Sequence, residues 1–142
     1  MIVYFDTSAL IKQVFEESGS DLPGELWDAG DRLVSTQIAY PEARAAAAAA
    51  HRAGRIGSDD LRDANREIDL IFDELELVGV DAPLVREAGD LAEGHGLRGY
   101  DAVHLASALS IDAPRLVVAT WEVDLAGAAS PKGLAVVPSH RG

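Results

Sequence analysis

Short apolar runs alternate with longer amphipathic stretches along the whole chain. Runs rich in the β-branched and aromatic residues of buried strands lie at residues 2–5, 32–35, 77–80, 115–120 and 134–137. Helix-like segments lie at residues 9–17, 21–29, 40–54, 59–75, 82–93, 100–109 and 124–129. Strands that alternate with helices form parallel βαβ units. We therefore predict an α/β fold in a single domain over residues 1–142, with an open, mostly parallel sheet of about five strands, helices on both faces, and a loose tail at residues 139–142.

Acidic residues stand where predicted strands end and helices begin. Asp6 directly follows the first strand, and Glu42 lies in the first turn of the helix after the second strand. Asp101 opens the helix before the fourth strand, and Glu122 and Asp124 follow that strand. In a parallel sheet the carboxyl ends of the strands share one edge, where ligands bind in folds of this class. The sequence therefore predicts a cluster of carboxylates at that edge.

Clustered carboxylates repel one another, and a bound divalent cation relieves that repulsion. Their hard oxygen atoms suit Mg²⁺ or Mn²⁺, which need few protein ligands and keep several waters. Taken singly, each acid is better explained as a helix cap or as a solvated residue at the rim of the sheet than as a metal ligand. The metal-site hypothesis therefore depends on several acids occurring at matching positions.

One of these acids lies in an unusual setting. Asp101 opens a helix that is otherwise apolar, and His104 follows one turn later. We interpret His104 as a hydrogen-bonded side chain that supports the site, in preference to a metal ligand. The other histidines have no spacing that indicates a zinc site.

The charge balance limits the classes of partner. The chain has 24 acidic and 12 basic residues and a formal net charge of −12. Such a surface excludes broad electrostatic binding to nucleic acid, and it favours a divalent cation or a basic protein partner. The chain has no cysteine, which excludes a disulfide framework or a thiolate metal site. We see no membrane-spanning stretch and no signal-peptide pattern, and we expect a cytoplasmic protein.

Residues 94–99 match the pattern G-x-G-x-x-G of dinucleotide-binding proteins. That fingerprint requires a strand before it and a helix after it. Here a predicted helix precedes it. We therefore interpret the segment as a turn between two helices.

Four segments resemble the motifs of one family. The opening strand with Asp6-Thr7-Ser8-Ala9-Leu10 is similar to the start of the PIN domain, and Glu42 stands where that family has its second acid. Residues 97–106, with the sequence LRGYDAVHLA, are similar to the family's third-acid motif and are the most specific match. Residues 118–121, VATW, resemble the strand that leads to its fourth acid. Over nearly its whole length the chain resembles the PIN domain, and within it the VapC-type toxin ribonucleases of type II toxin–antitoxin modules.

The resemblance implies a metal-dependent endoribonuclease that acts as the toxin of such a pair. It implies that Asp6, Glu42 and Asp101 hold Mg²⁺ or Mn²⁺ for the hydrolysis of RNA phosphodiesters. The family usually has an aspartate directly after the Thr-Trp pair, whereas this chain has Glu122 there and Asp124 two residues later. Either acid is a candidate for a second ion.

The remaining site residues follow from the same resemblance. Supporting roles are expected for Ser8, His104 and Thr120, of which Thr120 orients a water or a carboxylate. Because the net charge is −12, RNA binding requires local cations. The candidates are Lys12, Arg44 and Arg98. The resemblance also implies a basic, DNA-binding, VapB-like antitoxin as cognate partner, and a homodimer.

Three alternatives remain open at this stage. A phosphoreceiver domain has the same alternating architecture and would use Asp81 as its phosphate acceptor. That fold needs an acidic pair near the first strand and a lysine after the last strand. In this chain Lys132 precedes the last strand. A haloacid-dehalogenase-type hydrolase needs a second acid two residues after Asp6, where this chain has Ser8. The third alternative is a PIN-like binding protein that has lost catalysis, and Glu122 is the feature that supports it.

Overall fold

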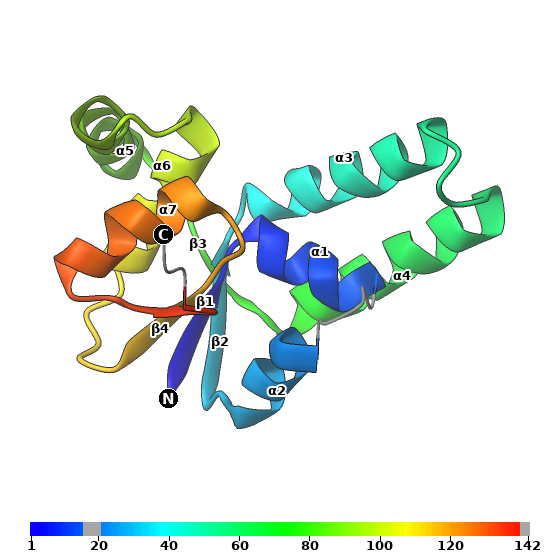
Figure 1. Ribbon diagram of the computed structural model, residues 1–142, viewed down its shortest axis with the longest axis horizontal. Helices are drawn as coiled ribbons and strands as arrows, with labels where there is room; N and C mark the ends of the chain where they lie inside the picture. The colour runs from blue at the N-terminus through cyan, green and yellow to red at the C-terminus, as the bar shows by residue number, and fades with distance from the viewer. Residues whose placement is uncertain (16–20, 140–142) are drawn as a thin grey trace.

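Within residues 1–15 and 21–139, which the computed structural model describes, five parallel strands form one sheet (Figure 1). The strands are β1 (Ile2–Phe5), β2 (Arg32–Thr36), β3 (Glu76–Val78), β4 (Leu116–Ala119) and β5 (Ala135–Val137). Their order across the sheet is β3-β2-β1-β4-β5, and every neighbouring pair is parallel. The predicted α/β fold with an open parallel sheet is confirmed.

The first strand is the centre of the sheet and of the core. Val3 and Phe5 are fully buried and pack with α1 (Thr7–Phe15), α2 (Asp21–Ala29), α3 (Ala39–Arg52) and α4 (Ser58–Glu74). Tyr4 points to the other face, where it packs with Val34 and with Ala108 of α6 (Gly99–Leu109). Both faces of β1 are therefore covered, which is why its sequence is a continuous apolar run.

Figure 1 shows α1–α4 on one side of the sheet and α5 (Ala82–His95), α6 and α7 (Val123–Ala129) on the other. A short 3₁₀ turn, Ser130–Lys132, follows α7. The prediction of helices on both faces is confirmed. None of the helices within the described ranges has the length and apolar composition needed to cross a membrane.

Helices α3 and α4 lie side by side and extend away from the sheet (Figure 1). The alanine run of α3 makes this packing possible, because Ala43, Ala47 and Ala50 are buried and present little bulk. The ring of Tyr40 lies edge-on to Phe72 of α4, with centroids 5.3 Å apart. The contact fixes the start of α3, which is the segment that carries Glu42.

Element boundaries differ from the predicted ones by one or two residues at several ends. Helix α1 begins at Thr7, two residues earlier than predicted, and α3 begins at Ala39, where Pro41 is tolerated because the first turn needs no N–H from it. Residues 16–17 of the first predicted helix and residues 140–142 of the predicted tail lie outside the described residues. Ser139, the first residue of that tail, is exposed and outside regular structure.

The G-x-G-x-x-G segment connects two helices, as predicted. Helix α5 ends at His95, and Gly96 follows in the left-handed conformation with φ 64°. This conformation is typical of a helix C-terminus and is accessible to glycine at little cost. Helix α6 then begins at Gly99, so no strand precedes the segment.

Candidate active site

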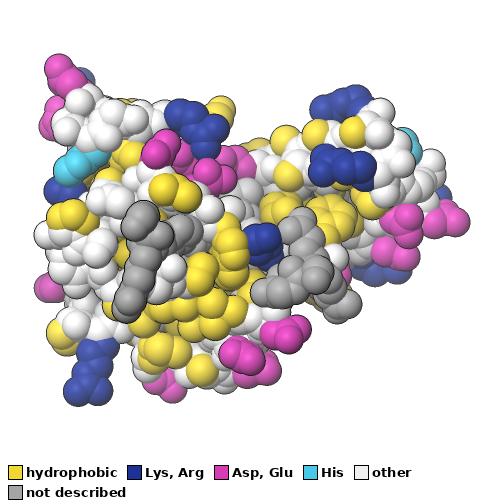
Figure 2. Space-filling model, in the orientation of Figure 1, with side chains coloured by type: hydrophobic (Ala, Val, Ile, Leu, Met, Phe, Trp, Pro, Cys, Tyr) yellow, Lys and Arg dark blue, Asp and Glu magenta, His cyan; other side chains and the backbone are white. Residues whose placement is uncertain are grey.

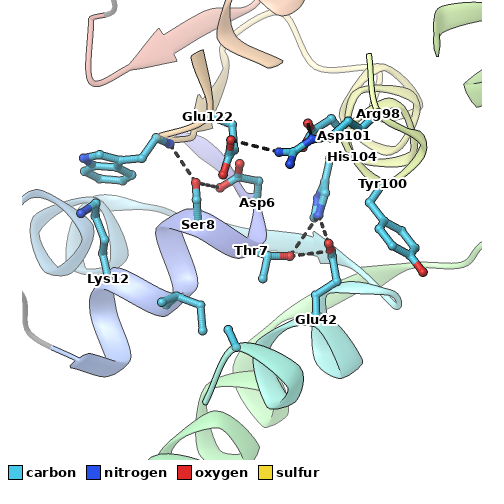
Figure 3. Close-up of a pocket in the computed structure, with 13 residues that line it drawn as sticks. Asp6, Thr7, Ser8, Lys12, Glu42, Arg98, Tyr100, Asp101, His104 and Glu122 are labelled. Atoms are coloured by element: carbon cyan, nitrogen blue, oxygen red, sulfur yellow. Dashed lines mark hydrogen bonds and ion pairs between the residues drawn. The ribbon is translucent and has the colours of Figure 1, made fainter. Parts of the chain in front are cut away.

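A cavity of about 540 Å³ opens where β1, β2 and β4 end and their following segments begin (Figure 3). In Figure 2, acidic and basic side chains gather around a hollow between the α5–α6 part and the α3–α4 part of this face. Most of the residues predicted for the site line this cavity: Asp6, Ser8, Lys12, Glu42, Arg98, Asp101, His104 and Glu122. The predicted convergence of carboxylates at one edge of the sheet is therefore present.

Asp6 is the most deeply buried of these acids, with 1% of its surface exposed. Its carboxylate accepts hydrogen bonds from Ser8 Oγ at 2.6 Å, from the backbone N–H of Ala9 at 2.9 Å, and from the Thr120 hydroxyl. Burial raises the pKa of Asp6, while the nearby His104 and these hydrogen bonds act in the opposite direction. Asp6 is thus both the cap of α1 and a residue of the cavity.

Thr120 joins the two central strands at the site. Its hydroxyl donates to Asp6 and accepts the backbone N–H of Glu122 at 3.0 Å. The backbone N–H of Trp121 donates to Ser8 Oγ at 2.8 Å. These bonds fix the loop after β4 against the end of β1, which sets the position of Glu122.

Glu42 is held by two side chains from other elements. The Thr7 hydroxyl donates to Glu42 Oε1 at 2.7 Å, and Nε2 of His104 lies 2.9 Å from the same oxygen (Figure 3). Burial alone would raise the pKa of Glu42, but the hydrogen bonds from His104 and Thr7 outweigh it, and the pKa lies below its ordinary value. Glu42 is therefore held as an ionised carboxylate, and His104 has the supporting contact predicted for it.

Arg98 bridges two further acids across the cavity. Its Nε lies 3.3 Å from Oδ2 of Asp101, and its Nη2 lies 3.3 Å from Oε2 of Glu122. Burial raises the pKa of Glu122, and the charge of Asp101 raises it further, whereas Arg98 lowers it. An exposed cation of the chain thus lies among the carboxylates, with 74% of its side chain accessible to solvent.

Three of the predicted residues do not line the cavity, and one of them, Thr120, is fully buried behind Asp6. Asp124 is exposed in the first turn of α7, so of the two candidates for the fourth acid it is Glu122 that lines the cavity. Arg44 lies on α3, where its guanidinium donates to the hydroxyl of Tyr40 at 2.8 Å and does not line the cavity.

Sequence reasoning missed four residues of the site: Tyr4, Thr7, Tyr100 and Trp121. Thr7 was read only as a helix cap, and Trp121 only as part of a motif. Tyr4 lies in a continuous apolar run, so nothing in the sequence distinguishes its hydroxyl from ordinary core. Tyr100 precedes Asp101 and is 65% exposed, a combination that only a structure reveals.

The donor set fits a hard divalent cation. Among the described residues, the acids that line the cavity offer only oxygen atoms, which Mg²⁺ and Mn²⁺ prefer. As arranged, no three acidic or histidine side chains of those residues converge into a ready metal site. The reason is visible in the contacts, because Thr120, His104 and Arg98 each engage a carboxylate. Rotation of the exposed Arg98 side chain would release two of the four acids.

The rival phosphoreceiver site has a simpler explanation. Asp81 follows β3, an edge strand of the sheet, and its carboxylate accepts the backbone N–H of Leu84 at 3.0 Å. It is the N-cap of α5 and does not line the cavity.

The sequence matches a known family over most of its length. The PIN domain model matches residues 3–124. Two curated proteins of Mycobacterium tuberculosis, Ribonuclease VapC45 and Ribonuclease VapC49, are each 44% identical to this chain over 139 residues, which is 98% of this chain and 96% of either relative.

Solved structures share the fold. PAE2754 from Pyrobaculum aerophilum superposes with a TM-score of 0.73 at 22% identity, covering 96% of this chain and 84% of that one. A toxin–antitoxin complex from Klebsiella pneumoniae contains a chain with a TM-score of 0.65 at 18% identity, covering 88% of this chain and 91% of that one. At these identities the likeness is one of fold.

Proposed function

The chain belongs to the PIN-domain family and is a VapC-type ribonuclease toxin, and from this premise we propose that it cleaves RNA internally with a divalent cation held by Asp6, Glu42 and Asp101. One observation carries the proposal: carboxylates from segments far apart in the sequence line a single cavity at the carboxyl edge of the sheet. This is the edge where open parallel sheets bind their ligands.

The protein's own side chains prepare these carboxylates. Ser8 and Thr120 orient Asp6, and Thr7 and His104 hold Glu42. Asp6, Glu42 and Asp101 would hold Mg²⁺ or Mn²⁺, which would supply Lewis-acid polarisation of a phosphodiester and a lower pKa for a bound water.

If a second ion is used, we assign its ligand to the acid that lines the cavity. Glu122 lines it, whereas Asp124 is exposed outside it. Glutamate is one methylene longer than the aspartate that the family usually has, and the bond from the Glu122 N–H to Thr120 sets where its side chain begins. We therefore propose Glu122 as the fourth acid.

Local cations have to bind the substrate, because the net charge of −12 opposes it. Lys12 and Arg98 line the cavity, and Nζ of Lys12 lies 5.6 Å from the centre of the Trp121 ring. We propose that both contact phosphates next to the one that is cleaved. Arg44 lies outside the cavity and would contact only RNA that extends beyond it.

Two observations support a proposal for the protein partner: the net charge of this chain and the complexes in which its structural neighbours occur. Structural neighbours of this chain come from toxin–antitoxin complexes, and a surface with a net charge of −12 attracts a basic protein. We propose a basic, DNA-binding antitoxin of the VapB type, a homodimeric toxin, and a cytoplasmic site of action, where RNA is available.

A second candidate function is a PIN-like binding protein without catalysis. Two observations favour it: Glu122 replaces the usual aspartate, and among the described residues no ready metal site is formed. Divalent cation binding separates the two candidates, since a protein that works only by binding its antitoxin has no need of the ion.

The test uses protein purified free of antitoxin. It is incubated with total bacterial RNA and Mn²⁺, with and without chelator, beside Asp101→Asn and a matched control, Asp90→Asn. Asp90 is an exposed aspartate on α5, outside the cavity. We expect discrete fragments from the wild type and from Asp90→Asn, and none from Asp101→Asn or with chelator.

Two results would change the proposal. Cleavage that persists in Asp101→Asn or in chelator contradicts a metal-dependent site at these residues. Absence of both cleavage and Mn²⁺ binding in the wild type supports the binding protein instead.

A further inference from the structure

Tyr4 carries a polar atom in the centre of the sheet. It is fully buried on β1, on the face where Val34, Val118 and Ala108 pack. A phenylalanine would fill this space without the cost of about 1–3 kcal/mol for burying a hydroxyl. A buried tyrosine hydroxyl requires a partner, and Nδ1 of His104, at 2.8 Å, is one such partner beside the hydroxyls of Ser107 and Ser35.

His104 links this hydroxyl to the cavity. The residue is 2% exposed, and its Nε2 lies 2.9 Å from Glu42 Oε1 and 3.1 Å from Thr7 Oγ1. Its ring stands edge-on to that of Tyr4, at 77° and with centroids 5.9 Å apart. Both ring nitrogens are therefore engaged, and the plane of the imidazole is fixed by a bond at each end.

The hydrogen positions in the series Tyr4–His104–Glu42 can be considered starting from the Glu42 carboxylate. The ionised carboxylate of Glu42 only accepts, so Nε2 of His104 is the donor to it. At the other side of the ring, Nδ1 lies 2.8 Å from the Tyr4 hydroxyl. Tyr4 thus holds the ring nitrogen opposite to the one that faces Glu42.

The bonds on Glu42 leave one oxygen for another partner. Within residues 1–15 and 21–139, both side-chain hydrogen bonds that Glu42 accepts, from Thr7 and His104, end on Oε1. A carboxylate held by one oxygen presents the other in a fixed direction. In proteins, such partners of metal ligands affect metal affinity or activity by about 10- to 100-fold.

We propose that Tyr4 is a positioning residue for the cation site: its hydroxyl fixes the ring of His104, which holds Oε1 of Glu42 and leaves Oε2 for the ion. The inference rests on the proposed function, because it takes Glu42 as a cation ligand. It extends the site to a residue in the interior of the sheet, one layer behind the residues that line the cavity.

The first test compares two tyrosine-to-phenylalanine variants. Tyr4→Phe removes only the proposed positioning hydroxyl. Tyr40→Phe is the matched control, because the Tyr40 hydroxyl also donates to a carboxylate, Asp69 Oδ1 at 2.6 Å, outside the cavity. Free Mn²⁺ is measured by electron paramagnetic resonance, and thermal unfolding is followed for each protein. We expect Mn²⁺ affinity to fall about 10-fold in Tyr4→Phe and to be unchanged in Tyr40→Phe.

The second test asks whether Tyr4 acts through His104. In His104→Gln the amide N–H replaces the Nε2 donor without needing Tyr4. We expect that adding Tyr4→Phe to His104→Gln causes no further loss of Mn²⁺ affinity, which is the non-additivity expected of coupled residues. In wild type, nitrogen-15 spectra should show His104 protonated at Nε2, and Tyr4→Phe should change that signal.

The outcomes are distinct. Wild-type affinity in Tyr4→Phe, or an equal loss in both backgrounds, overturns the role of Tyr4 while the cation site stands. Failure of the wild type to bind Mn²⁺ at all overturns the proposed function itself, and this inference with it.

Discussion

The Nη2 atom of Arg98 lies 3.3 Å from Oε2 of Glu122, so the residue that precedes α6 is joined to the loop after β4 across the cavity that both residues line. The same guanidinium reaches Asp101. One cation of the chain therefore already balances part of the negative charge that a metal ion would balance. Its high exposure means that the pairing is weak and exchangeable.

Removal of this cation should separate metal binding from RNA binding. In Arg98→Ala we expect Mn²⁺ affinity to rise about 3-fold, because an exposed competing charge is worth less than about 1 kcal/mol. RNA affinity should fall, and its logarithmic salt dependence should decrease in slope by about 1. Mn²⁺ titration and filter binding at several salt concentrations measure both. Arg86→Ala, on the exposed surface of α5, is the control; an unchanged salt slope in Arg98→Ala would contradict an RNA contact.

Asp6→Asn should abolish cleavage with little effect on folding. The loss should exceed the roughly 100-fold upper range for partners of metal ligands, because a direct ligand is removed. Burial raises the pKa of Asp6, so the ionised form is disfavoured in the folded chain, and a neutral amide relieves that cost. We expect the free energy of unfolding to change by less than about 1.5 kcal/mol. Cleavage assays and urea unfolding test this, and retained cleavage would remove Asp6 from the site.

The fourth acid can be identified by two neutral substitutions. Glu122 lines the cavity and Asp124 does not. Glu122→Gln should therefore reduce the cleavage rate at least about 10-fold, whereas Asp124→Asn should leave it within about 2-fold. The rates are compared at saturating Mn²⁺. The reverse order would assign the role to Asp124 and imply a rearranged loop.

Thr120 should matter for stability as well as for the site. Thr120→Val keeps the shape of the side chain but removes the donor to Oδ2 of the buried Asp6 carboxylate, while Ser8 and Ala9 still donate to Oδ1, and it removes the acceptor of the Glu122 N–H. The expected loss is about 1–3 kcal/mol in the free energy of unfolding. Thr120→Ser, which keeps the hydroxyl, should lose less than half of that. A loss in Thr120→Ser as large as that in Thr120→Val would contradict the dominant role of the hydroxyl.

Cation binding should stabilise the folded chain. At a Mn²⁺ concentration about 100 times the dissociation constant, the gain is about 2.7 kcal/mol. Thermal unfolding of the wild type and of Asp90→Asn should shift upward alike, and Asp101→Asn should not respond. A shift that survives in Asp101→Asn would place the ion elsewhere.

The parts of the site that the sequence predicts are those fixed by topology. Asp6 follows a central strand, and parallel strands end at one edge, so its neighbourhood with Glu42 and Asp101 follows from the order of the elements. The supporting role of His104 was predicted from its place one turn after Asp101. In the structure Nε2 of His104 contacts Oε1 of Glu42, and its role in the site stays a prediction.

The parts that could not be predicted depend on local backbone and side-chain rotation. That Glu122 lines the cavity and Asp124 does not depends on the course of the loop after β4, where the Glu122 N–H donates to Thr120, and no pattern of residue types encodes this. The role of Tyr4 could not be predicted, because a strand buried on both faces is apolar throughout and its sequence does not single out one side chain. The direction of the Arg98 guanidinium is a rotamer choice among three acids.

The central place of β1 has a consequence for synthesis of the protein. The first strand to leave the ribosome needs β4, residues 116–119, as its neighbour, and Asp6 needs Thr120 as its donor. More than four-fifths of the described sequence must therefore emerge before the carboxylates can gather. The cavity therefore cannot assemble on a growing chain while β4 and Thr120 have yet to be made, however early β1 itself is available.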